Sequence, residues 1–335
     1  MLSVWSEFGL CAALIAFAGR RLSYYGDVIA DKTGLSGNWI GMILLASVTS
    51  LPELVTGISA VTLADAPELA VGNVLGSCMV NLSMLAVIDF LHRRESFYRR
   101  ASRAHILSAG FGIVSLAFVG IGILLGSTTP RAAVGHISVQ ALVIFVLYGV
   151  AIRTVLVFER EQIREFAADV ADRYPDLSLG RAVRGYLLAA VIVVCAGLWL
   201  PFIGTRLSDV MNWHGSFVGT LLMAAATTLP ELAVTVSAIR IGALDMAIAN
   251  LLGSNLFNVT ILAVDDLFYL KGPIFAQITP VQAFSAFSGC LMTGLAVIGL
   301  SCRPGVRLLS AVGWISLCLI FVYVLNAWVL FHFGG

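Results

Sequence analysis

Ten apolar stretches, each close to the length of a membrane span, limit what this chain can fold into. A transmembrane helix needs about 20 mostly apolar residues, and the stretches lie at 3–19, 37–62, 67–91, 104–125, 137–157, 186–204, 215–239, 244–267, 278–301 and 308–332. Only 12% of the residues are charged, against about 25% in soluble domains. The sequence therefore predicts an all-α polytopic membrane protein with ten transmembrane helices, and the first and sixth stretches have the weakest patterns.

The basic residues predict the orientation of these helices. Of the 20 lysines and arginines, all but Arg131, Arg206 and Lys271 lie in or beside the loops that follow odd-numbered stretches. The positive-inside rule places those loops in the cytoplasm, so both termini are expected on the extracytoplasmic side. The N-terminus lacks the basic flank and cleavage site of a signal peptide, and arginine greatly outnumbers lysine. We expect a multi-pass protein of a prokaryotic cell (inner, cytoplasmic) membrane, embedded in its lipid bilayer.

An apolar element occurs twice in the chain. Shifted by 178 residues, "GNWIGMILLASVTSLPELVTGISAVT" at 37–62 aligns with "GSFVGTLLMAAATTLPELAVTVSAIR" at 215–240. After one deletion, "NVLGSCMVNLSMLAVIDFL" aligns with "NLLGSNLFNVTILAVDDLF", and 20 of these 45 positions are identical. Five stretches separate each element from its copy, so the second copy enters the membrane from the opposite side.

This arrangement predicts two inverted five-helix repeats, as in many secondary transporters that work by alternating access. The first repeat covers 1–157, with the repeated element at 37–91. A cytoplasmic linker, 158–185, contains the longest polar segment, 158–181. The second repeat covers 186–335, with its copy of the element at 215–268.

Each copy carries a glutamate directly after a proline in the middle of an apolar stretch. A charge at this depth costs about 2.5–3.5 kcal/mol, and neither stretch contains a lysine or arginine that could compensate Glu53 or Glu231. The natural partner is a cation from solution. Pro52 and Pro230 lack an N–H group and so free backbone carbonyls about one turn upstream.

The polar residues around these acids carry hard oxygen ligands. Hydroxyls come from Thr49, Ser50, Thr227 and Thr228, and a second helical face in each copy presents Ser77 with Asn81 or Ser254 with Asn258. Such oxygens suit Ca²⁺ or Na⁺. The six cysteines and five histidines show no metal-binding spacing, so a zinc site is not expected. Two glutamates are neutralised by one Ca²⁺, two Na⁺ or two protons, and this balance predicts antiport.

The segments "SLPELVTGISA" with "VGNVLGSCMVN", and "TLPELAVTVSA" with "ANLLGSNLFN", resemble the two alpha-repeats of the sodium/calcium exchanger family, within the calcium/cation antiporter superfamily. The resemblance implies that Ca²⁺ binds between Glu53 and Glu231 with the backbone oxygens of Thr49 and Thr227. It implies that Na⁺ uses these groups together with Ala46, Ser50, Ser77, Asn81, Ala224, Thr228, Ser254 and Asn258. It also implies long, tilted first and sixth helices that slide against the core.

The chain departs from the family pattern at several positions. Val48 and Ala226 stand where a glycine is common, Cys78 replaces a frequent asparagine, and Asn258 replaces an aspartate of many prokaryotic members. The last change limits the fixed charge of the site to that of two carboxylates. The counter-ion and the stoichiometry are therefore left open by the sequence.

The function predicted is Ca²⁺/Na⁺ antiport, with ions bound between the second, third, seventh and eighth spans. A Ca²⁺ (or other cation)/H⁺ antiporter is the alternative, and an intramembrane carboxylate hydrolase or a passive channel is less favoured. We expect no enzyme activity, no cofactor, no nucleic-acid partner and a monomer.

Several polar residues are expected to lie outside the ion site. Asp89, Asp265 and Asp266 are predicted to be solvated at span ends, and Glu68 is left out because no acidic counterpart aligns with it. Gly76 and Gly253 are predicted to permit close helix packing.

Overall fold

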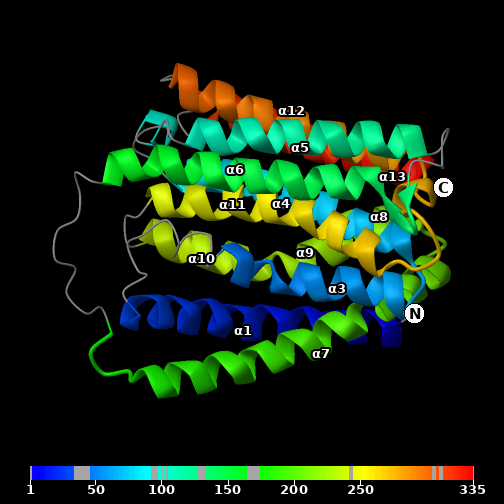
Figure 1. Ribbon diagram of the computed structural model, residues 1–335, viewed down its shortest axis with the longest axis horizontal. Helices are drawn as coiled ribbons and strands as arrows, with labels where there is room; N and C mark the ends of the chain where they lie inside the picture. Colours follow the sequence, from blue (N-terminus) through cyan, green and yellow to red (C-terminus); the bar gives the residue numbers. More distant parts are fainter. Residues whose placement is uncertain are drawn as a thin grey trace.

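The computed structural model describes residues 2–33, 46–91, 97–99, 101–102, 105–126, 133–163, 174–240, 244–303, 307–308 and 312–334. These residues form a bundle of helices that run along one long axis, and the two chain ends lie at the same end of the bundle (Figure 1). The beginning of the predicted span 37–62 and the middle of the polar segment 158–181 lie outside the described residues.

Eight long helices make up most of the bundle. They are α1 (Leu2–Lys32), α4 (Pro67–Leu91), α5 (His105–Gly126), α6 (Val139–Ile163), α7 (Leu179–Met211), α11 (Leu244–Phe268), α12 (Gln282–Cys302) and α13 (Trp314–Phe333).

Shorter elements complete the described chain. The helical ones are α3 (Leu51–Thr62), η1 (Phe97–Arg99), α8 (Gly215–Phe217), the π-helical η2 (Val218–Met223), α9 (Ala224–Thr227), α10 (Leu229–Arg240) and η3 (Ile274–Ala276). Two antiparallel strand pairs join β1 (Ala133–Val134) to β2 (Ile137–Ser138) and β3 (Arg307–Leu308) to β4 (Val312–Gly313).

The membrane-spanning character of the sequence is confirmed at a coarser level than predicted. Seven described helices are long and apolar enough to cross a membrane, and an eighth span is formed if Gly215–Thr227 and Leu229–Arg240, which meet at 46°, count as one. Two shorter apolar helices, Leu51–Thr62 and Val139–Val155, lie in the remaining predicted stretches. Large apolar side chains on the outer faces of α6, α7 and α13 are exposed, as expected of surfaces that contact lipid.

The first and sixth predicted spans prove to be continuous and long. Helices α1 and α7 have 31 and 33 residues, and α7 contains Pro201 without a break. The helix ends where Asn212 adopts a left-handed backbone conformation (φ 54°). The predicted stretches 3–19 and 186–204 cover only part of these helices, and the expectation from the family resemblance that the first and sixth helices are long is confirmed.

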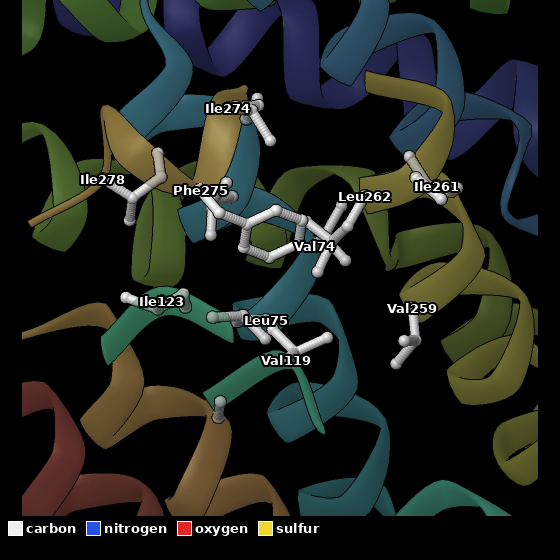
Figure 2. Packing of buried hydrophobic residues seen from close by; sticks show 14 of the residues in the cluster. Val74, Leu75, Val119, Ile123, Val259, Ile261, Leu262, Ile274, Phe275 and Ile278 are labelled. Carbon is white, nitrogen blue, oxygen red and sulfur yellow. The ribbon is translucent and has the colours of Figure 1, made fainter. Parts of the chain in front are cut away.

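Two buried helices form the centre of the bundle, and two other helices pack at its edge. Helices α4 and α11 pack against each other and are the most buried of the long helices. Around them, Val74 and Leu75 of α4 and Leu262 of α11 join side chains of α5 and η3 in an apolar cluster (Figure 2). Helices α1 and α7 lie side by side at one edge of the bundle (Figure 1), where α1 contacts α10 and α7 contacts α3.

Acidic side chains at the ends of α4 and α11 bond to helices of the other half of the chain. At the start of α4, Glu68 accepts hydrogen bonds from the Thr279 amide and, at 3.4 Å, from the Gln282 side chain. At the start of α11, Asp245 accepts one from the Ser102 amide at 2.7 Å and lies 3.0 Å from the His105 ring nitrogen.

These two sets of contacts are equivalent. Residues 68, 102 and 105 match 245, 279 and 282 when shifted by 177. The prediction that Glu68 has no acidic counterpart was wrong, because the one-residue deletion between the copies falls before this position.

The C-terminal ends of α4 and α11 also carry acids at equivalent positions, Asp89 and Asp266. Asp89 accepts hydrogen bonds from the Gly313 amide at 2.7 Å and the Ser316 hydroxyl at 2.8 Å. Asp266 accepts them from the amide and hydroxyl of Ser138, at 2.7 and 2.9 Å, and from the Ile274 amide at 2.6 Å.

We call Glu68, Asp89, Asp245 and Asp266 the boundary acids. Each joins a helix of one half to a segment of the other, so the halves interlock. Asp89 and Asp266, together with Asp265 beside them, are fully buried, which contradicts the prediction that these three acids are solvated. Asp89 bonds to the start of α13, and Asp266 bonds to segments before α6 and α12, contacts that hydropathy alone does not reveal.

Candidate ion-binding site

Two helices are broken at equivalent residues, and each break precedes an acid. A single non-helical residue, Ser50 or Thr228, separates two helical pieces. The pieces that follow begin with Leu-Pro-Glu, so that Glu53 and Glu231 lie in the first turns of α3 and α10. The amide groups at a helix N-terminus favour negative charge at this place. The carbonyls of the preceding turn lose helical partners, because a helix end and a proline both withhold N–H donors.

Both carboxylates are fully buried and lie close enough to act on each other electrostatically. One oxygen of Glu53 accepts a hydrogen bond from the Ser77 hydroxyl at 3.3 Å. One oxygen of Glu231 accepts a hydrogen bond from the Ser50 hydroxyl at 3.0 Å. Within the described part of the chain, the second oxygen of each carboxylate has no hydrogen-bond partner. Each acid therefore retains an oxygen that could bind a cation.

Hydroxyl groups connect the two copies around the acids. The Thr49 hydroxyl lies 3.3 Å from that of Ser254, and the equivalent Thr227 hydroxyl lies 3.4 Å from that of Ser77. These two contacts correspond under the repeat, and in each a broken helix of one half faces α4 or α11 of the other. All four hydroxyls are buried. The structure thus brings together the two predicted acids with Thr49, Thr227, Ser50, Ser77 and Ser254.

The predicted carbonyl ligands lie beside this group, but local donors engage them. The Ala46 carbonyl accepts hydrogen bonds from the Ser50 amide at 3.1 Å and the Thr49 hydroxyl at 3.0 Å. The Ala224 carbonyl accepts them from the Thr228 amide and hydroxyl at 3.0 and 2.6 Å. Thr228 therefore differs from its counterpart Ser50, which bonds to a glutamate of the other half.

The two predicted asparagines have no hydrogen bond to either glutamate. The Asn81 amide donates to the Asn255 side chain at 3.0 Å, and its own oxygen is unpartnered among the described residues. Both polar atoms of the Asn258 side chain are buried without a partner in the same set of residues. Asn255 in turn donates to the Cys78 carbonyl at 3.1 Å. These amides form a polar layer between α4 and α11 next to the hydroxyls.

Two further asparagines were missed by the sequence interpretation. Asn73 is buried and accepts a hydrogen bond from the Thr227 hydroxyl at 3.1 Å. Its counterpart Asn250 is buried with both polar atoms unpartnered among described residues. A signal for both exists in the sequence, because each begins the aligned NVLGS or NLLGS segment.

Close packing at Gly76 explains how Ser77 reaches the site. A Cβ atom at Gly76 would collide with the Thr220 carbonyl of η2 and lie 2.7 Å from the Ala224 Cβ. At Gly253 an added Cβ would lie 3.3 Å from the Ala46 Cβ, tighter than usual. The prediction that these glycines permit close packing is confirmed.

The chemistry of the site is that of oxygen. Among the described residues, no three His, Cys, Asp or Glu side chains gather in a group that could hold a metal ion. What the site offers is two carboxylates, hydroxyls, amide oxygens and carbonyls, a set that matches hard cations and not zinc or copper.

Comparison with known proteins agrees with this chemistry. The model of the sodium/calcium exchanger protein family matches residues 3–157 and 182–331. The chain belongs to this family. The match covers both copies of the repeated element, and the resemblance that the motifs indicated is confirmed.

Individual known proteins resemble the chain along most of its length. The inner membrane protein YrbG of Escherichia coli (strain K12) is 25% identical over 254 residues, which cover 74% of each protein. Two solved structures share the fold. The H⁺/Ca²⁺ exchanger CAX has a TM-score of 0.71 at 15% identity, over 97% of this chain and 85% of that one. The sodium-calcium exchanger NCX_Mj has a TM-score of 0.56 at 19% identity, over 97% of both chains. The chain is thus a member of a family of Ca²⁺/cation exchangers with a multi-pass membrane-transporter fold.

Proposed function

We propose that this protein exchanges Ca²⁺ for Na⁺ across the cell membrane by alternating access, with the ions bound between α4, α11 and the two broken helices. The observation that carries the proposal is the pair of buried acids, Glu53 and Glu231, each with an oxygen that has no partner among the described residues. An uncompensated buried charge is costly. A Ca²⁺ ion, or two Na⁺ ions, would neutralise the pair and use the surrounding hydroxyls and carbonyls.

The same reasoning excludes a change of the empty site from one side of the membrane to the other without a bound cation. Because two uncompensated carboxylates in the membrane interior would cost several kcal/mol, the site changes sides with a cation bound. Inward movement of one cation then requires outward movement of another. This is the physical basis of exchange, and it distinguishes the proposal from a channel or an enzyme.

The peripheral helices support alternating access between two inverted five-helix repeats in a ten-helix protein. Gly19 of α1 and Gly197 of α7 are equivalent, 178 residues apart. A Cβ at Gly19 would collide with Pro230, directly before Glu231, whereas a Cβ at Gly197 would lie 3.0 Å from Val55. Val55 is three residues beyond Pro52, the counterpart of Pro230.

The two peripheral helices therefore pack in different registers on equivalent segments. Three residues correspond to about 4.5 Å along a helix. In the opposite state the two halves exchange registers, so that α7 packs at Pro52 and α1 packs three residues beyond Pro230. Access to the site then changes from one face of the membrane to the other.

Proton coupling is the second candidate. Asn258 leaves the site with two carboxylates, and two protons neutralise them as well as two Na⁺ ions do. The hydroxyls that bond to Glu53 and Glu231 in this structure are also compatible with protonated acids. We propose a cytoplasmic-membrane location with both termini outside the cytoplasm, from the distribution of lysine and arginine, and a functional monomer.

The coupling ion is tested by uptake of radioactive calcium into proteoliposomes. An outward Na⁺ gradient and an outward proton gradient are applied separately, and Glu53→Gln serves as the inactive control. Uptake driven by Na⁺ and absent in the control is the expected result. Uptake driven only by protons would replace Na⁺ by H⁺ as the counter-ion, and uptake in neither condition would contradict Ca²⁺ as the substrate.

A further inference from the structure

One buried acid of α11 takes no part in the contacts that explain the others. The boundary acids each accept hydrogen bonds from the other half of the chain, and Glu53 and Glu231 belong to the ion site. Asp265 is also fully buried, but neither of its carboxylate oxygens has a hydrogen-bond partner among the described residues. Its counterpart in the first half is Ile88, which is equally buried. The equivalent buried position in the first half is thus filled by an apolar side chain and not by an acid.

A glycine of α3 makes room for the Asp265 carboxylate. A Cβ on Gly57 would lie 2.5 Å from both of its oxygens, so any side chain larger than glycine would displace the acid. Gly57 is four residues beyond Glu53 and on the same face of α3, about 6 Å further along the helix axis. Asp265 therefore lies one helical turn from the ion-binding acid, on the side towards the loop that joins α3 and α4.

Among the described residues, no positive charge in this region compensates Asp265. Its neighbour Asp266 is bonded to Ser138 and Ile274. Lys271 pairs with Asp65 on the surface at 2.5 Å, and this bond raises the pKa of Lys271.

None of the other titratable side chains described on the elements that pack against α11 bonds to Asp265. His136 bonds to the Leu267 carbonyl, and Arg153 and Arg240 are exposed. The remaining described groups with assigned burial are Glu53, Glu68, Cys78, Asp89, His105, Tyr148 and Glu231, with Asp245 on α11 itself. Since Asp265 has no bond to any of them, a bound proton is what can neutralise it.

A second buried polar group without a partner among the described residues lies next to Gly57 in the sequence. The Thr56 hydroxyl, next to Gly57, is fully buried and has no partner in the described chain. It lies where Gly197 of α7 packs on α3, 3.4 Å from an added Cβ at that glycine. The register shift of α7 described above would change the cover over this segment of α3, and thus the access of water to it.

We propose that Asp265 is a proton-binding site next to the ion site, and that it releases and rebinds one proton in step with Ca²⁺ transport. When a cation occupies the pathway beside Glu53, Asp265–COOH loses its proton to water and becomes the carboxylate. When the cation leaves, the carboxylate takes a proton back. The inference rests on the proposed function, and it adds a proton to the transport cycle whichever ion drives the main exchange.

The test counts protons moved for each Ca²⁺. Purified protein is reconstituted in vesicles that contain a pH-sensitive dye, the membrane potential is held at zero, and Ca²⁺ movement is measured with radioactive calcium. Asp265→Asn and Asp265→Ile, the latter copying Ile88, are compared with wild type. Asp65→Asn, an exposed acid at the same end of the molecule, is the control.

We expect both Asp265 variants to move about one proton fewer per Ca²⁺ than wild type, and the control to match wild type. An equal proton count in wild type and in the variants would overturn the role of Asp265 and leave Ca²⁺ exchange intact. If wild type carries no Ca²⁺ at all, the proposed function fails, and the inference fails with it.

A second measurement needs no variant. A hydrophobic carbodiimide reacts with protonated carboxyl groups inside membranes, and peptide mapping locates the adduct. We expect an adduct on Asp265 of the wild-type protein that decreases when Ca²⁺ is added. The absence of an adduct on Asp265, or one that Ca²⁺ does not affect, would contradict the proposal.

Discussion

The two halves of the molecule agree at the ends of their central helices and differ beside the ion-binding acids. Glu68 and Asp245 make equivalent contacts in the two halves, and Asp89 and Asp266 each accept a hydrogen bond from an equivalent serine hydroxyl, that of Ser316 or Ser138. In contrast, Ser50 bonds to Glu231, whereas its counterpart Thr228 bonds to the Ala224 carbonyl. The peripheral glycines Gly19 and Gly197 also pack in different registers.

Under the proposed alternating access, this comparison separates a scaffold from a moving part. Contacts that obey the internal symmetry can persist when the two halves exchange roles, because they are the same before and after. Contacts that break the symmetry must change. The interlocked ends of α4 and α11 therefore belong to the scaffold, and α1, α7 and the hydroxyls beside the acids belong to the part that changes.

The largest effect on transport is expected from substitution of Glu53 or Glu231, the two acids beside which the halves differ. Glu53→Gln and Glu231→Gln should each lower Ca²⁺ transport by more than about 100-fold, since removing one partner of a buried charge group costs about 3–5 kcal/mol. Initial rates of Ca²⁺/Ca²⁺ exchange in proteoliposomes measure this without a choice of counter-ion. A large effect for one acid and a small effect for the other would show that the halves do not share one site.

Substitutions of Asp266, a boundary acid, and of Asp265 beside it should have different effects on the stability of the protein. Asp266→Ala removes the acceptor of three hydrogen bonds. We expect it to destabilise the protein by about 3 kcal/mol or more, because bonds to charged groups contribute about 1.5–3 kcal/mol each.

Asp265→Ile should be neutral or stabilising, because it removes an unpartnered buried acid. Thermal unfolding in detergent compares the two variants. If both lose the same stability, the distinction between boundary acids and Asp265 is wrong.

The peripheral glycines test the difference in register. Gly19→Ala should reduce stability and transport more than Gly197→Ala, because only the first places a Cβ in collision with a proline ring. Overpacking of this kind costs about 1–3 kcal/mol. Equal effects on transport and unfolding temperature would contradict the registers seen in this structure.

The smallest effect is expected at the surface pair between Lys271 and Asp65. Both side chains are more than half exposed, at 63% and 58%. Solvent and salt screen such exposed pairs, so Asp65→Asn should leave unfolding and transport within the error of wild type. A marked loss of transport would show that this end of the molecule takes part in more than a surface contact.

Much of the site could be predicted from the sequence because it is repeated. The LPEL segments placed Glu53 and Glu231 at equivalent depths, and the hydroxyls at Thr49 and Thr227 followed from the same alignment. Residue types and their repetition were enough, since inverted symmetry brings equivalent positions together.

The rest depends on contacts that local patterns do not reveal. The burial of Asp89 and Asp266 arises from turns that fold over the helix ends. A signal for these turns was present in the aligned Gly-His-Ile-Ser and Gly-Trp-Ile-Ser at 135–138 and 313–316. The counterpart of Glu68 was missed by one residue because of the deletion. The asymmetry of Ser50 and Thr228 cannot be predicted from a repeat at all, since a repeat predicts the same contact for both residues.

The most direct test of the account is equilibrium binding of radioactive calcium to the purified protein. We predict one Ca²⁺ bound per chain in wild type, and loss of that binding in Glu53→Gln and in Glu231→Gln alike, because both acids hold the same ion. Binding that persists in either variant with an affinity close to that of wild type would contradict the shared site between the two halves.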